Sequence, residues 1–299
     1  MVLLLQNEPG TDLYCGRKGS LIRVVTDSSC DLPPEVVQEH DITVVPMHIN
    51  VGNKSFLDGV EMTRAAFYEG LPDFEVQPTT SVPGPQALTR VYEELAATGA
   101  REIVSIHIAG SLSGMVNSAR LAAQEVRSAT VSVVDSGNLT LGLGLQALSA
   151  ARAAEQGRSL VDVMALVRDQ AARTYSFAAI YTVEYLRRGG RLSRLQAGLA
   201  SALRIKPLIR INQGDLEMER VRTWQGLLRR LLEQLEGLGP LEDMALVHAH
   251  APERLEDLRQ RARSLVPTDR TPLVAEVTPT IGAHVGPGAV GLVAVVAAP

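Results

Sequence analysis

The chain has 299 residues, with 29 Lys and Arg against 33 Asp and Glu, so its formal net charge at pH 7 is -4. This acidic balance excludes the basic surface that non-specific nucleic-acid binding requires, and we expect no nucleic-acid partner. Hydrophobic residues make up 45% of the chain and aromatic residues only 4%, which predicts an aliphatic lining for any pocket. This length indicates two domains, because single cores rarely grow beyond about 250 residues.

The N-terminal segment 1–20 contains Gly, Pro and Asn without periodicity and is interpreted as an irregular leader. Its apolar start is too short to span a bilayer, and polar residues follow where a signal peptide would continue. We therefore expect a cytoplasmic protein. The two cysteines, Cys15 and Cys30, lack the spacing of a zinc site, and Cys30 is interpreted as a packed thiol rather than a nucleophile.

The first half of the chain alternates short apolar runs with amphipathic stretches. Strands are predicted over 21–26, 42–46, 102–108 and 130–134, and helices over 34–40, 64–69, 85–97 and 113–127. This alternation is typical of a parallel sheet covered by helices on both faces. We predict an N-terminal parallel-sheet α/β domain over residues 21–172.

Three polar motifs each follow a predicted strand and precede a helix. They are Asp27-Ser28-Ser29, Ser111-Leu112-Ser113-Gly114 and Asp135-Ser136-Gly137. Because the carboxyl ends of parallel strands meet at one edge of a sheet, we expect all three motifs at that edge, where ligands usually bind.

The second half begins after a stretch, 139–172, that reads as two helices separated by Gly157, with Ser159 as the cap of the second. Further strands are predicted over 177–181, 206–211, 216–221, 244–248, 273–277 and 289–296, and helices over 193–203, 224–235 and 252–265. We predict a C-terminal α/β domain with a mixed sheet over residues 173–299.

A glycine-rich segment from Ile281 to Gly291 places the imidazole of His284 just before the last apolar run. Glycines permit close backbone approach, so a loop here would bring His284 and several amides to a small polar group. Hydroxyls of Thr79 and Thr80, and those of the Ser111-to-Gly114 motif, have the same character. Together they predict an anion site built from uncharged groups.

The ordered set of motifs resembles the DegV family of bacterial fatty-acid-binding proteins, from about Ile22 to the C-terminus. The motifs are Val24-Val25-Thr26-Asp27-Ser28-Ser29, Thr79-Thr80-Ser81-Val82-Pro83, Leu112-Ser113-Gly114, Val134-Asp135-Ser136, Arg188-Gly189-Gly190-Arg191-Leu192-Ser193, Lys206-Pro207 and His284-Val285-Gly286-Pro287-Gly288. Seven motifs in order are far more specific than any one alone.

This resemblance implies a two-domain α/β fold that buries one long-chain fatty acid, with no cofactor. It implies that a fatty acid kinase catalytic subunit is the partner and that the kinase phosphorylates the bound carboxylate. We also expect transient membrane contact. By motif, Thr79, Thr80, Ser113 and His284 are expected at the carboxylate, with Arg191 nearby. Arg222 matches an arginine that the family uses to engage its kinase.

The chain departs from the family pattern around Ser113. Ala109 and Gly110 stand where the family often has two serines, so Ser111 is a substitute donor for the head group. Met115, Val116 and Asn117 replace the usual Thr, aromatic and Gln.

Each candidate also has a structural interpretation. Thr79 and Thr80 suit caps of the helix after Pro85, Ser113 suits an N-cap, and His284 suits an ordinary loop histidine. An acyl-transfer enzyme with Ser113 as nucleophile and His284 as base is the alternative function, although a Gly-x-Ser-x-Gly elbow and an orienting acid are missing. A lipid-responsive sensor is a third.

Metal binding is not expected from the sequence. His248 and His250 lie two residues apart on a predicted strand, but no third ligand is evident beside them.

Overall fold

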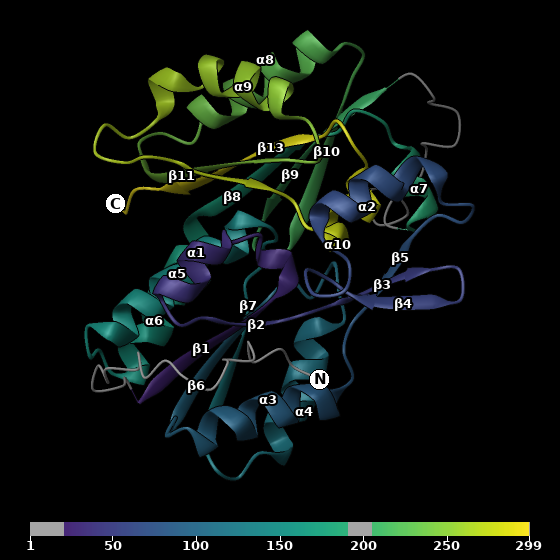
Figure 1. Cartoon of the computed structure of the whole chain (residues 1–299). Helices are drawn as coiled ribbons and strands as arrows, with labels where there is room; N and C mark the ends of the chain where they lie inside the picture. Colours follow the sequence, from purple (N-terminus) through teal and green to yellow (C-terminus); the bar gives the residue numbers. More distant parts are fainter. Residues whose placement is uncertain (1–20, 191–204, 299) are drawn as a thin grey trace.

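The computed structural model describes residues 21–190 and 205–298. The predicted leader, the helix predicted over 193–203 and Arg191 lie outside the described residues. Within them, the strands form three sheets of four, six and three strands (Figure 1). No helix in these two ranges combines the length and the apolar character needed to cross a bilayer.

The first sheet is wholly parallel and has the strand order β2-β1-β6-β7. Its strands are β1 (Ile22–Asp27), β2 (Thr43–Val45), β6 (Glu102–His107) and β7 (Thr130–Asp135). Helices α3 and α4 lie on one side of it and α1, α5 and α6 on the other (Figure 1). These helices are α1 (Pro34–Glu39), α3 (Pro85–Ala97), α4 (Met115–Glu125), α5 (Leu141–Glu155) and α6 (Leu160–Arg173). The predicted parallel sheet is confirmed.

The second sheet is mixed and has the order β10-β9-β8-β13-β11-β12, in which only the β11–β12 pair is parallel. Its strands are β8 (Thr174–Ala179), β9 (Lys206–Asn212), β10 (Asp215–Val221), β11 (Leu241–His248), β12 (Leu273–Glu276) and β13 (Val290–Val296). Helices α8 (Trp224–Glu236) and α9 (Pro252–Arg261) cover its outer face through a separate apolar cluster (Figure 1). Its inner face packs on the main core. The predicted two-domain α/β class is confirmed, whereas the boundary at residues 172 and 173 stays a prediction.

A third sheet was not predicted from the sequence. It is antiparallel, with β3 (His48–Val51) paired to both β4 (Lys54–Leu57) and β5 (Thr79–Ser81). Helix α2 (Arg64–Gly70) lies between β4 and β5 in the chain. Three- and four-residue strands carry too little alternation to be recognised. The consequence for function is direct, because β5 contains Thr79 and Thr80.

Two short helices complete the arrangement, α7 (Glu184–Arg188) and α10 (Pro279–Val285). The prediction of a glycine-rich loop at His284 was wrong, because His284 lies in α10. Gly282 serves close packing here: a Cβ on it would lie 2.5 Å from the hydroxyl of Tyr68. The glycine therefore admits a neighbouring ring and does not end the helix.

Candidate functional site

An apolar cavity of about 190 Å³ lies between the six-stranded sheet, the small sheet and the loop after β6. Most of its lining is aliphatic, including Ile108, Leu112, Ile180, Ile209, Val247 and Val293. An apolar cavity of about 150 Å³ already stays dry and takes up a small hydrocarbon. This cavity is suited to an aliphatic group.

Three of the predicted site residues, Thr80, Ser113 and His284, line this cavity. They come from β5, from the turn before α4 and from α10, so the fold brings together residues more than 200 positions apart. Thr80 Oγ1 lies 2.9 Å from His284 Nε2, at hydrogen-bonding distance. All three residues are partly exposed rather than buried. Hydroxyls and an imidazole beside an aliphatic space are donors suited to a carboxylate with an apolar tail.

Thr79 and Ser111 lie differently. Thr79 is exposed and does not line the cavity, whereas Thr80 lines it and lies against His284. The Ser111 hydroxyl donates to the carbonyl of Gly214 at 2.7 Å, which ties its turn to the β9–β10 hairpin. Ser81, which was not proposed as a site residue, lines the cavity.

Ser113 also acts locally. Its hydroxyl accepts a hydrogen bond from the amide of Met115 at 3.3 Å, at the start of α4. The helix begins two residues later than expected, with Gly114 at its N-cap, so Ser113 belongs to the turn rather than to the helix.

Close glycine contacts hold His284 in place. A Cβ on Gly189 would lie 2.4 Å from His284 Nδ1, so only glycine lets the end of α7 approach the imidazole this closely. Gly286 follows α10 with a φ of 70°, and a Cβ there would meet the Tyr185 ring at 2.1 Å. The two glycine motifs therefore pack α7 against α10.

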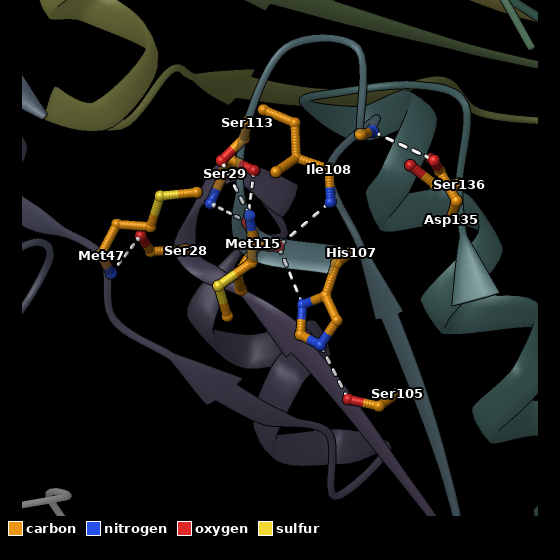
Figure 2. Close-up of polar contacts among 12 residues, drawn as sticks. Ser28, Ser29, Met47, Ser105, His107, Ile108, Ser113, Met115, Asp135 and Ser136 are labelled. Atoms are coloured by element: carbon orange, nitrogen blue, oxygen red, sulfur yellow. Dashed lines mark hydrogen bonds and ion pairs between the residues drawn. The ribbon is translucent and has the colours of Figure 1, made fainter. Parts of the chain in front are cut away.

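Two aspartates, Asp27 and Asp135, hold the edge of the parallel sheet, and Figure 2 shows Asp135. Asp27 accepts the amide of Ile108 at 3.1 Å, and Asp135 accepts the amide of Gly110 at 3.1 Å. Both bonds anchor the loop that leads to Ser113. The predicted meeting of the three motifs at one edge is confirmed. A Cβ on Gly110 would lie 2.8 Å from the Asp135 carboxylate, so the backbone of this loop lies close to that side chain.

A buried chain of polar groups lies beneath this edge. His107 Nε2 is 2.7 Å from the hydroxyl of Ser105 (Figure 2), and His107 Nδ1 is 3.0 Å from Asp27. The Ser105 hydroxyl also lies 2.8 Å from the hydroxyl of Tyr92. The residue types are those of a Ser-His-Asp triad. All four side chains are fully buried, however, so this serine cannot meet a substrate and the chain of bonds supports the fold.

Two further buried acids hold the start of α10, and the sequence analysis missed both. Asp31 accepts the amide of Thr278 at 2.8 Å, and Asp58 accepts the amide of Thr280 at 3.3 Å together with the Thr280 hydroxyl. Burial raises the pKa of Asp31 to about 7 and that of Asp58 to about 6. The position of Asp31, two residues after the Asp27-Ser28-Ser29 motif, is the sequence feature that could have identified it as part of the site.

The remaining candidates are placed as follows. Arg222 is exposed between β10 and α8, where a partner can reach it. His248 accepts the amide of Ala251, and His250 pairs with Glu276 at 3.2 Å. Across residues 21–190 and 205–298, no group of three metal-ligating side chains occurs.

Cys30 is buried, and burial raises the pKa of its thiol, which disfavours the reactive thiolate.

The geometry around Ser113 and His284 does not support the alternative function of an acyl-transfer enzyme. The contact at His284 Nε2 is the hydroxyl of Thr80, and Ser113 is bonded to the start of α4. The carboxylate of Asp27 orients His107 instead. The predicted nucleophile and base therefore do not form the hydrogen-bonded pair that this chemistry uses.

Comparison with known proteins places these features in a family. The family model described as DegV family matches residues 21–297. The chain belongs to the DegV family. A DegV domain-containing protein of Streptomyces coelicolor is 37% identical over 276 residues, which cover 91% of this chain and 97% of the relative.

Two solved DegV structures share the fold. A DegV family protein from Thermus thermophilus, described for its fatty acid binding, is 32% identical with a TM-score of 0.82, and the match covers 92% of this chain and 99% of that one. DegV of Bacillus subtilis, described as a fatty acid binding protein, is 27% identical with a TM-score of 0.83 over the same shares. DegV structures thus include proteins that bind fatty acids.

Proposed function

We propose that this protein binds one long-chain fatty acid in the cavity and presents its carboxylate to a fatty acid kinase, which forms the acyl phosphate. The observation that carries the proposal is the Thr80–His284 pair, 2.9 Å apart, on the wall of a largely aliphatic cavity. The chain's membership in the DegV family supports it. The protein then acts as a carrier, and catalysis belongs to the partner.

The apolar tail supplies most of the affinity in this proposal. Each buried methylene contributes about 0.8 kcal/mol, so a chain of fourteen to eighteen carbons contributes on the order of 10 kcal/mol before ordering costs. Thr80, Ser113 and His284 then fix which end of the ligand lies at the polar wall, because each donor bond to a charged group adds about 1.5 to 3 kcal/mol. The tail therefore provides most of the affinity, and the head group determines the orientation of the ligand.

Delivery to the partner is assigned to the surface around Arg222. An exposed arginine steers association with an acidic partner without contributing to the core. Loading of the carrier requires transient contact with a lipid surface in the cytoplasm.

Native mass spectrometry of the purified protein tests the carrier function. We expect an added mass of one fatty acid per chain, which organic solvent extracts as the free acid. Delipidated protein that also fails to bind palmitate or oleate would contradict the proposal. Hydrolysis of acyl esters that Ser113→Ala abolishes would favour the enzyme instead.

A further inference from the structure

Helix α10 carries the cavity residues Thr280, Ile281, His284 and Val285, yet its first turn has no cap from its own side chains. The caps come from Asp31 and Asp58, which lie 247 and 222 residues earlier in the chain. A helix of seven residues is only about 10 Å long and moves as one unit. Any shift at its start therefore moves His284.

Asp58 also reaches the cavity by a second route. The Ser28 hydroxyl donates to Asp58 at 2.8 Å and accepts the amide of Met47 at 3.1 Å. Met47 lines the cavity. Asp58 thus connects the helix on one side of the cavity with the segment before β3 on another.

Each acid has one oxygen in use and one without a partner. Asp31 bonds to α10 through Oδ1, and Asp58 through Oδ2, whereas Asp31 Oδ2 and Asp58 Oδ1 have no hydrogen bond and are buried. A proton on the unused oxygen therefore leaves the bonds to α10 intact. It also removes a negative charge from a site in which both side chains are at most 2% exposed.

The groups around the two acids do little to offset two negative charges. The one nearby cation among the residues described is Arg64 of α2, a helix that lies beside α10 in Figure 1. The acids also act on each other unfavourably. The other titratable groups that face this site from the surrounding elements are Cys30, Asp27, Tyr68, Glu276 and the ring of His250 stacked on Tyr68.

We propose that Asp31 and Asp58 are positioning residues for the head-group site, and that protonation of this pair seats α10 and so tightens fatty-acid binding. The inference rests on the proposed function, since it concerns the affinity of that same site. It adds a regulation: the carrier holds its ligand more tightly in an acidic setting and releases it more readily as the pH rises.

The direction follows from linkage. With α10 seated, the pKa values of Asp31 and Asp58 are raised to about 7 and about 6, because both carboxyls are buried. When α10 moves away, water reaches the carboxyls and their pKa values return towards 3.8. The seated form binds protons more tightly, so protons favour it, and this preference is lost as the pH rises through 6 to 7.

The test measures palmitate affinity of delipidated protein from pH 5.5 to pH 8. We expect the wild-type affinity to fall by roughly tenfold over this range, within the usual size of coupling between sites. Asp58→Asn keeps a carbonyl oxygen for Thr280 without a titrating group, so its affinity should vary less with pH than that of the wild type, while Asp31 supplies the remaining slope. Asp73→Asn, which changes an exposed acid after α2, is the matched control and should keep the wild-type profile.

Comparison of variants at each pH cancels the ionisation of palmitate itself. A wild-type profile that is flat, or an Asp58→Asn profile with the wild-type slope, would overturn the positioning role. If Asp58→Asn does not fold, Asp31→Asn is measured against the same two criteria. Absence of palmitate binding at every pH would instead contradict the proposed function.

Discussion

Two clusters of polar residues in this molecule contain the same kinds of side chain but have different roles. Beneath the sheet edge, Asp27, His107 and Ser105 are fully buried and bonded to one another. At the cavity, Thr80 and His284 are only partly buried and face an aliphatic space. Accessibility to a ligand, rather than residue type, therefore distinguishes a cluster that supports the fold from a cluster that can bind a ligand.

The largest expected effect comes from breaking the buried cluster. Asp27→Ala leaves His107, the amide of Ile108 and Ser29 without their shared acceptor. Each buried polar group left without a partner costs about 1 to 3 kcal/mol, so three such groups make this the largest loss expected. Urea unfolding should show this loss in the free energy of unfolding, whereas Thr80→Val should lower it by less than about 1 kcal/mol. Equal losses in the two variants would erase the distinction drawn here.

The second largest effect is expected in the pH dependence of the free energy of unfolding, and it comes from Asp58. Asp58 has a pKa of about 6 in the fold against 3.8 when exposed, so its ionisation lowers stability as the pH rises from about 4 to about 6. Each pH unit of that interval is worth about 1.4 kcal/mol, which gives a change of about 3 kcal/mol. Asp58→Asn should remove this part of the pH dependence of unfolding. A variant curve parallel to the wild-type curve would show that Asp58 titrates normally.

The third effect concerns affinity rather than folding. Thr80→Val, Ser113→Ala and His284→Ala each remove one donor to the proposed carboxylate, at about 1.5 to 3 kcal/mol each. Palmitate titration should show affinity losses of roughly 10- to 150-fold, with near wild-type thermal unfolding. Burial of the apolar tail should supply the affinity that remains in each variant. Wild-type affinity in all three variants would place the head group elsewhere.

The smallest effect on the protein itself is expected at Arg222. Because its side chain is exposed, Arg222→Glu should change the free energy of unfolding by no more than about 0.5 kcal/mol and leave bound lipid unchanged. Acyl-phosphate formation with a cognate kinase should nevertheless fall. Arg229→Glu, which changes an exposed arginine of α8, is the control. Unaltered coupling after charge reversal would remove Arg222 from the docking surface.

The parts of the fold that local pattern controls were predictable. The alternation of apolar runs indicated the parallel sheet, and the three motifs after its strands were correctly expected at one edge, where Asp27 and Asp135 now anchor the loop to Ser113. The resemblance, rather than any single motif, led to Thr80 and His284. Their contact spans 204 residues, which no local pattern encodes.

The failures have a common physical cause. Glycine at position 282 was interpreted as a sign of a loop, yet its purpose is the close approach of Tyr68, a residue from another element. Asp31 and Asp58 look like ordinary turn residues, and only tertiary packing buries them against α10. Side chains that serve distant partners carry no local signature.

The distant capping of α10 has a consequence during protein synthesis. The two acids that cap it, Asp31 and Asp58, precede it by more than 220 residues in the chain. A ribosome must therefore synthesise the chain as far as Val285 before His284 can reach Thr80 on a capped helix. A nascent chain that lacks α10 should therefore not bind a fatty acid in the way proposed.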